Sequence, residues 1–212
     1  MKHTVKGGAP NEFEVWKQGG WTPGYTDLQN PEKAQVHAAL IKEQGGVCCY
    51  CGRSVSQADS HIEHFRPQES RPDLALDYAN LHASCIRETK PGNPLHCGHF
   101  KGNHFDENSH ISPLDSGCEE RFRFTLMGNV LPAKLDDAAA KYMIDLLSLD
   151  CHFLSNRRQE ALEDVFDPQF IESATPDELE KLAEAFRQRD DYGHLSNFGH
   201  VVARYADQLR FP

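Results

Sequence analysis

Long apolar stretches are absent from this chain of 212 residues, and none approaches the length needed to cross a membrane. The first eight residues also lack an apolar stretch of the kind that forms a secretory signal. Basic charge is scarce, because 22 Lys and Arg stand against 32 Asp and Glu and give a formal net charge of −10. The sequence therefore predicts a cytoplasmic protein without a membrane segment, whose surface is not suited to non-specific binding of nucleic acid.

Internal repeats and low-complexity tracts are also missing, and the sequence divides into three regions. Region 1–47 contains several Gly pairs and one predicted helix, which begins at Asn30-Pro31-Glu32 and ends at Gly45-Gly46. Region 48–132 is rich in Cys, His, Pro and Gly, has little periodicity, and ends in a predicted hairpin over 121–131. Region 133–212 has the spacing of a helical unit.

Four helices are predicted in region 133–212. They cover residues 138–149, residues 153–166, a segment that begins at Thr175, and residues 197–209. Thr175 is a typical N-cap, followed by Pro at the first helical position and by acids in the first turn. Leu179, Leu182 and Phe186 share one face of that third helix, which we expect to be core or a surface for a partner.

Cysteine and histidine are concentrated in one part of the chain. Six of the seven Cys and seven of the twelve His lie between residues 48 and 118. An odd number of Cys without a signal peptide favours a reducing compartment, in which metal binding is more common than disulfides. The pair Cys48 and Cys51 has the spacing that places two thiolates at two corners of a tetrahedral zinc site. Cys85 and Cys97 are the natural second pair.

Two other interpretations of these cysteines stay open. Buried Cys residues behave as small apolar side chains, and a Cys-x-x-Cys pair also occurs in redox proteins. However, the sequence around Cys48 and Cys51 does not resemble a thioredoxin-like βαβ unit. We expect Cys49 to be a buried residue or a free thiol outside the zinc site, and Cys118 and Cys151 to lie in the core.

Four short motifs follow one another in an order that is typical of HNH nucleases. They are the Cys-x-x-Cys pair at 48–51, the run His-Ile-Glu-His-Phe-Arg-Pro at 61–67, Asn-Leu at 80–81 ahead of Cys85, and Cys-x-x-x-Lys at 97–101. Any one of them alone is a weak signal, whereas all four in this order form a specific pattern.

With these motifs the chain resembles the HNH endonucleases that accompany retrons and Septu anti-phage systems, the PtuB-like proteins. The resemblance extends more loosely into Leu146–Leu149 and Arg157-Arg158. It implies an α+β fold with a zinc-stapled ββα-metal (HNH) core in region 48–132. It also implies a complex with an ABC-type ATPase, and an association with a retron reverse transcriptase and its non-coding RNA and DNA.

The resemblance implies a role for each residue of the second and third motifs. His64 would be the general base that activates water, because the ordinary pKa of histidine lies near working pH. Glu63 would hold a catalytic divalent ion, Mg²⁺, through a hard oxygen ligand. Asn80 would orient His64. The four cysteines would then hold a structural zinc ion that clamps this unit.

The last motif departs from the family pattern. Related sequences usually carry His or Asn directly after the last Cys, whereas this chain has Gly98 there and His99 one position later. We expect His99 to be the second ligand of the catalytic ion, with Asn103 and His104 as alternatives. His61 is either a further ligand or a hydrogen-bonding neighbour. Arg66 and Lys101 are the candidates for contacts with phosphate.

Two rival functions remain to be compared with a nuclease. His61-Ile62-Glu63 matches the His-x-Glu of zinc deaminases, but those need a Cys-x-x-Cys after the His, and here that pair comes before it. A non-catalytic zinc module that docks a protein or nucleic acid would retain the four Cys but would have no use for Glu63, His64 and Asn80.

The charge is unevenly divided along the chain. Residues 1–130 hold 13 basic and 16 acidic residues, a net of −3, and residues 131–212 hold 9 and 16, a net of −7. Much of the grip on a nucleic acid should therefore come from a partner. HNH sites act mostly on DNA, and the sequence leaves both DNA and RNA open as the target. We expect region 133–212 to dock the ATPase, so that deletion of residues 170–212 abolishes co-purification.

Overall fold

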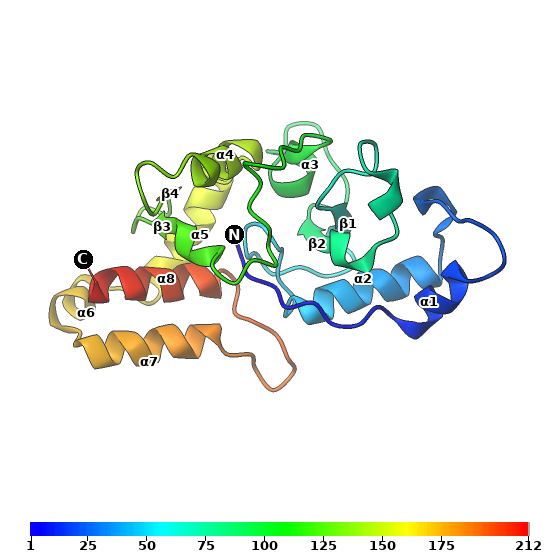
Figure 1. The fold of residues 1–212 in the computed structure, drawn as a ribbon. Coiled ribbons are helices and arrows are strands. Elements are labelled where there is room, and N and C mark those ends of the chain that lie inside the picture. Colours follow the sequence, from blue (N-terminus) through cyan, green and yellow to red (C-terminus); the bar gives the residue numbers. More distant parts are fainter. Residues whose placement is uncertain (212) are drawn as a thin grey trace.

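The computed structural model describes residues 1–211 and has mixed α+β architecture with two small antiparallel sheets (Figure 1). The helices of the described residues are α1 (Asn11–Lys17), α2 (Glu32–Glu43), α3 (Cys97–Lys101), α4 (Ala138–Leu146), α5 (His152–Glu163), α6 (Pro168–Ser173), α7 (Pro176–Arg187) and α8 (Gly199–Arg210). The strands are β1 (Ser60–His64), β2 (Leu81–Cys85), β3 (Phe122–Phe124) and β4 (Val130–Pro132). None of the helices in residues 1–211 has the length and apolar character that spanning a bilayer requires.

The first region holds two helices rather than the single helix that was predicted between Asn30 and Gly46. α2 lies where it was expected, but α1 was missed, because seven residues are too few for a clear helical periodicity. Tertiary packing explains why α1 forms. Phe13 is fully buried, stacks on Trp16 with ring centroids 6.0 Å apart, and joins a small apolar core with Leu40 of α2 and Leu81 of β2.

A strand, a second strand and a short helix form the central unit of the fold. β1 and β2 pair antiparallel, with His61 opposite Ser84 and Glu63 opposite His82. Because side chains alternate along a strand, His61 and Glu63 lie on one face of this hairpin and His64 lies on the other. α3 packs against β2, and α2 packs against both strands. Figure 1 shows α3 and α2 on opposite sides of the hairpin.

The remaining helices form the other half of the molecule, together with the hairpin β3–β4. This hairpin was predicted from alternating apolar residues, and β3 and β4 lie where it was expected. It packs against α4 and α8 rather than against β1 and β2, so it belongs structurally with region 133–212. α7 begins with the expected cap: the Thr175 hydroxyl accepts the Glu178 N–H, and the Glu178 carboxylate accepts the Thr175 N–H. The short helix α6 was not predicted.

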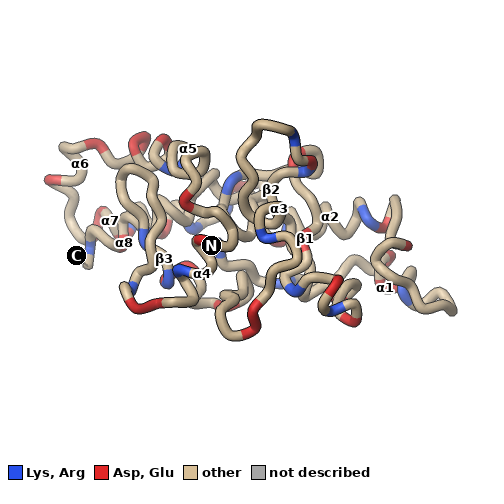
Figure 2. The backbone as a smooth tube through the Cα atoms, turned by 90° about the horizontal axis from the view of Figure 1, so that it is seen from above, with Lys and Arg blue, Asp and Glu red and all other residues tan. Residues whose placement is uncertain are grey.

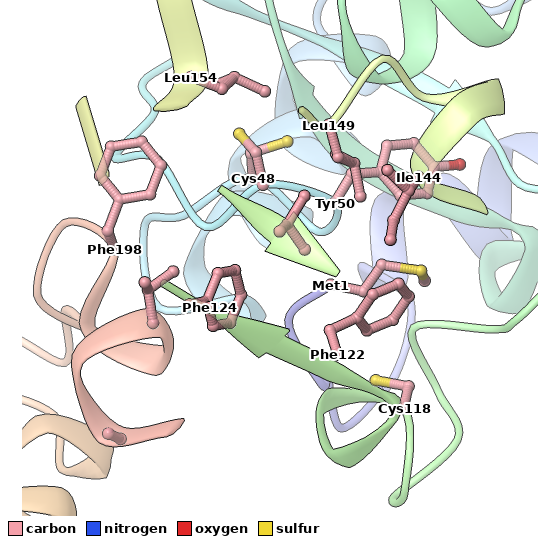
Figure 3. Packing of buried hydrophobic residues seen from close by; sticks show 14 of the residues in the cluster. Met1, Cys48, Tyr50, Cys118, Phe122, Phe124, Ile144, Leu149, Leu154 and Phe198 are labelled. Atoms are coloured by element: carbon pink, nitrogen blue, oxygen red, sulfur yellow. The ribbon is translucent and has the colours of Figure 1, made fainter. Parts of the chain in front are cut away.

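One buried apolar cluster joins the cysteine-rich region to the C-terminal helices. It contains the cysteines of residues 48–51 together with residues of α4, α5, α7 and α8. Figure 3 shows Met1, Cys118 and Phe122 meeting in this core, with Phe124 and Phe198 nearby. The expected boundary between 132 and 133 is therefore not a boundary between two cores.

Gly52 lies at a close contact between the two halves. It has a φ of +74°, which favours glycine, and an added Cβ would lie 2.2 Å from the His200 ring of α8. The Phe198 N–H donates to the Gly52 carbonyl at 2.9 Å. α8 is thus fastened directly to the turn that follows the Cys48–Cys51 pair.

Candidate metal centre and active site

The four predicted cysteines converge. The Sγ atoms of Cys48, Cys51, Cys85 and Cys97 all lie within 4.8 Å of one another, and all four residues are buried. A tetrahedral zinc ion with Zn–S bonds of about 2.3 Å places its sulfurs about 3.8 Å apart. The Sγ atoms of Cys51 and Cys85 are 3.7 Å apart. The cluster therefore has the ligand type and spacing of a structural zinc site, and the other three Cys, 49, 118 and 151, lie outside it.

The chain reaches this centre from three elements. Cys48 and Cys51 flank a turn that is closed by a hydrogen bond from the Gly52 N–H to the Cys48 carbonyl at 3.0 Å. Cys85 ends β2, and Cys97 begins α3 with a φ of +56°, an uncommon backbone conformation for a residue with a side chain. An ion held by the four cysteines would therefore fix the end of the hairpin to the start of α3.

The ionisation of the four cysteines favours the binding of a cation between them. Hydrogen bonds from neighbouring thiols hold the pKa of Cys48 well below its usual range, although burial opposes this. Burial and the same neighbours raise the pKa of Cys97 well above its usual range. Four buried thiolates repel one another, so all four can be ionised only around a positive ion. A bound Zn²⁺ would supply that charge.

His96 is a member of the zinc environment that sequence reasoning missed. Its Nδ1 lies 3.3 Å from Cys97 Sγ and 3.5 Å from Cys85 Sγ, and its ring stacks on Phe153 with centroids 5.6 Å apart. Burial lowers the pKa of His96 to about 4, so the ring is neutral and Nδ1–H can donate to a thiolate. The sign of this role in the sequence was that His96 directly precedes Cys97.

His64 lies at the end of β1, and one of its ring nitrogens is hydrogen bonded while the other is not. Nε2 donates to the Ala75 carbonyl at 3.0 Å, and the ring meets the edge of Tyr25 with centroids 4.4 Å apart. Nδ1 has no hydrogen bond within residues 1–211. Burial lowers the pKa of His64, so the ring is neutral near pH 7 and Nδ1 carries the lone pair that a general base needs.

Glu63, the neighbour of His64, is buried among three donors. Its Oε1 accepts from Lys101 Nζ at 2.8 Å and from the Tyr50 hydroxyl at 3.2 Å, and its Oε2 lies 3.3 Å from His61 Nε2. Burial opposes ionisation, but His61 and Lys101 together hold the pKa of Glu63 below its usual range. Glu63 is therefore a carboxylate whose charge is already balanced within the protein.

Lys101 does not contact solvent, and the expectation that it binds phosphate was wrong. Its side chain is 1% exposed, and Nζ donates to the His64 carbonyl at 2.9 Å as well as to Glu63. The motif spacing placed Lys101 near the site but gave no sign of its burial. Its role is to hold the backbone of His64 and the carboxylate of Glu63 together.

Asn80 does not bind the His64 side chain. Its Oδ1 accepts from the Arg66 N–H at 2.7 Å, and its Nδ2 donates to the carbonyls of Arg66 and Leu74 at 2.9 and 3.1 Å. It therefore braces the loop that leads to Ala75, whose carbonyl holds His64. Asn80 positions His64 indirectly, through the loop, rather than by direct contact.

The structure does not assemble the predicted catalytic ion site. Within residues 1–211 the four cysteines are the only group of three or more His, Cys, Asp or Glu whose ligand atoms lie within 4.8 Å of one another. Glu63 is paired with Lys101, whereas Asn103 bonds to Glu69 and His104 to the Lys101 carbonyl. Asn103 and His104 are thus engaged elsewhere.

Two observations nevertheless fit an ion beside Glu63. The Nε2 atom of His99 is buried without a hydrogen-bond partner, and the His99 ring lies 4.3 Å from that of His61. Gly98 has no side chain, and a Cβ there would lie 2.4 Å from Glu63 Oε2 and 2.8 Å from His61 Nε2. The missing side chain of Gly98 is what allows His61 and Glu63 to lie against α3.

Arg66 lies at the surface near the site. Its guanidinium pairs with Glu107, with Nε 3.2 Å from Oε2, and lies over the Phe105 ring at 5.4 Å. The pair is solvent-exposed, so Arg66 can exchange Glu107 for a phosphate at little energetic cost. No family model matches the chain, and a search of curated proteins finds no match.

Proposed function

We propose that this chain is a metal-dependent HNH endonuclease that hydrolyses phosphodiester bonds of nucleic acid. The observation that carries the proposal is His64, a neutral histidine with Nε2 bound to Ala75 and Nδ1 free. It lies in a strand–strand–helix unit whose end is fastened by four cysteines. The family resemblance implied a ββα unit around these residues, and this strand–strand–helix arrangement supports the proposal.

In this mechanism Nδ1 of His64 takes a proton from the attacking water, while Nε2–H stays bound to the Ala75 carbonyl. The water oxygen bonds to phosphorus and the bond to the leaving oxygen breaks. Lys101 fixes the His64 backbone, and Asn80 fixes the loop that holds the ring. The protein therefore supplies a base that is already oriented before substrate binds.

A divalent ion, Mg²⁺ or a similar cation, is part of the proposal. Glu63 and His99 would hold it, with His61 beside them, and it would stabilise the negative charge that develops on the phosphate. Its binding requires the carboxylate of Glu63 to leave Lys101 at least in part. Calorimetric titration of Mn²⁺ into the protein and into Glu63→Gln tests this part separately.

The rival functions explain less of this arrangement. A deaminase keeps one zinc position open for water, whereas four cysteines fill the tetrahedron here. A non-catalytic adaptor accounts for the zinc cluster, but it leaves the oriented His64 and the buried Glu63–Lys101 pair without a purpose. The adaptor therefore remains the alternative that an activity assay must exclude.

The proposed setting is an anti-phage defence complex in the cytoplasm, with an ABC-type ATPase and, in a retron, a reverse transcriptase with its RNA and DNA. Charge supports the need for a partner. Figure 2 shows acidic and basic residues interspersed along the tube. A chain of net charge −10 with few cationic contacts binds duplex DNA weakly at physiological salt.

The deciding experiment compares wild type with His64→Ala in cleavage of plasmid DNA, single-stranded DNA and RNA. The assay contains Mg²⁺ or Mn²⁺ and is run with and without the ATPase partner. Loss of a general base should slow cleavage by about 10²–10⁴-fold. His152→Ala, at an exposed position of α5, is the control and should leave the rate unchanged. Equal rates for wild type and His64→Ala would exclude this mechanism.

A further inference from the structure

A polar cleft of about 580 Å³ lies along β1, on the side where α2 packs. It is open to solvent, and its lining comes from α2, from the segment before it, from β1 and from the residues that follow β2. The lining residues that matter for its chemistry are Tyr25, Asn30, Lys33, Gln57, Arg87 and Glu88. His61 and Ile62 of the second motif also line it, but the motifs did not single out its two cations.

The two cations of the cleft are free of ion pairs. Neither Lys33 nor Arg87 forms a salt bridge within residues 1–211, although Glu88 is part of the same lining. Arg87 donates from Nη1 to the Gln57 carbonyl at 2.6 Å, a contact that orients the guanidinium without neutralising it. Arg66, by contrast, is paired with Glu107. In an acidic protein, two uncompensated cations in one concave surface favour an anionic ligand.

Tyr25 connects the cleft to the proposed base. Its ring lines the cleft and also contacts the His64 ring, with centroids 4.4 Å apart. The Lys33 ammonium lies 5.1 Å from the centroid of the same Tyr25 ring. Only the Tyr25 ring therefore separates a ligand in this part of the cleft from His64.

We propose that this cleft binds the sugar-phosphate strand that flanks the scissile bond, with Lys33 and Arg87 on phosphates and Tyr25 against a sugar or base. The inference deepens the proposed function, on which it rests, by naming residues that hold the substrate. Phosphate contacts position a strand without reading its sequence. Aromatic stacking adds affinity that is tolerant of sequence, so the cleft favours a single strand over a duplex.

The test measures binding separately from cleavage. Fluorescence anisotropy of labelled single-stranded DNA, single-stranded RNA and duplex DNA is recorded for the full-length His64→Ala protein at several salt concentrations from 50 mM upward. Adding Lys33→Ala and Arg87→Ala should weaken single-strand binding at least tenfold. It should also reduce the slope of log affinity against log salt by about 1.4, or about 0.7 for each lost contact.

The matched control removes two cations elsewhere on the surface, which are exposed and form no salt bridge within residues 1–211, in the changes Arg123→Ala and Lys134→Ala. It alters the net charge equally and should leave affinity and slope nearly unchanged. Equal losses in both double variants would show a general charge effect and overturn the cleft, and so would unchanged binding when Lys33 and Arg87 are removed. If the cleft variants lose binding but His64→Ala still cleaves, the cleft stands and the mechanism fails.

Discussion

His82 is the most isolated polar side chain of the central unit. Its ring is fully buried on β2, opposite Glu63, and neither nitrogen has a hydrogen-bond partner within residues 1–211. Burial lowers the pKa of His82 to about 3, against an ordinary value of 6.5. Below pH 6.5 the unfolded chain therefore binds a proton that the folded chain does not bind, so the free energy of unfolding falls as the pH drops from 6.5 toward 3.

Replacement of His82 by Leu should remove this acid sensitivity. Between pH 6.5 and 5.5 the wild type should lose about 1 kcal/mol more stability than His82→Leu. The reason is that the unfolded wild type takes up a proton on His82, and the variant has no such group. Urea unfolding at both pH values measures the difference, and the other histidines cancel because both proteins have them. An equal loss in the two proteins would contradict the assignment of a low pKa to His82.

Gly98 has a steric role that distinguishes this chain from the pattern it resembles. Alanine in a helix is ordinarily more stable than glycine by about 0.5–1 kcal/mol. At position 98, however, the new Cβ would lie 2.4 Å from Glu63 Oε2, and Glu63 is held by Lys101. We expect Gly98→Ala to lower the free energy of unfolding by about 1–3 kcal/mol, as overpacking does. Gly8→Ala, in open space, should change it by less than about 0.5 kcal/mol. Thermal and urea unfolding measure whether Gly98→Ala lowers or raises the free energy of unfolding.

Motif spacing identified individual residues well but not their partners. The convergence of the four cysteines was predictable because Cys spacing reflects the geometry of a single metal ion, and all four do converge. The burial of Lys101 and the loop contacts of Asn80 depend on how α3 and the 66–74 segment pack, which spacing does not encode. For the same reason the cation pair Lys33 and Arg87, 54 positions apart in the chain, could not be associated from the sequence.

At the scale of elements, helices with strong caps or long apolar faces were predictable, and short ones were not. α7 was identified from its Thr175 cap and its first-turn acids, and the observed capping box explains why. α1 and α6 have seven and six residues, so their stability comes from packing rather than from local propensity. The hairpin β1–β2 was predicted only through the family motif, since its residues are mixed in polarity.

The hairpin and α3 should depend on zinc, because the cluster joins the end of β2 to the start of α3. We expect one zinc ion per chain by elemental analysis. Cys51→Ser should lose the ion and most of the stability of the fold, since structural zinc supplies folding free energy directly. Cys151→Ser, which changes a cysteine outside the cluster, is the control and should retain the metal. Full zinc content in Cys51→Ser, or none in the wild type, would exclude the site.

At the scale of the whole molecule, the two halves share one core, which changes the meaning of a truncation. Val201 and Val202 of α8 are buried in the same cluster as Cys48 and Cys51, and Phe198 is hydrogen bonded to Gly52. Deleting residues 170–212 would therefore open the core and disturb the zinc turn. The sequence analysis treated loss of co-purification in that variant as evidence for a docking surface. Because the deletion also damages the core, such a loss would not identify a docking surface.

Removal of residues 197–212 should accordingly abolish cooperative unfolding and lower the zinc content, whether or not a partner is present. Circular dichroism during heating and elemental analysis measure the two effects. Docking of the ATPase is tested instead by Asp177→Lys with Glu184→Lys, two exposed acids of α7 that leave the buried Leu179 in place. This pair should weaken co-purification while the zinc content stays unchanged and the melting temperature falls by only about 1–4 °C, the cost of reversing a first-turn acid. If the truncated chain still unfolds cooperatively with its zinc bound, α8 is a separable appendage and the shared core contributes little to stability.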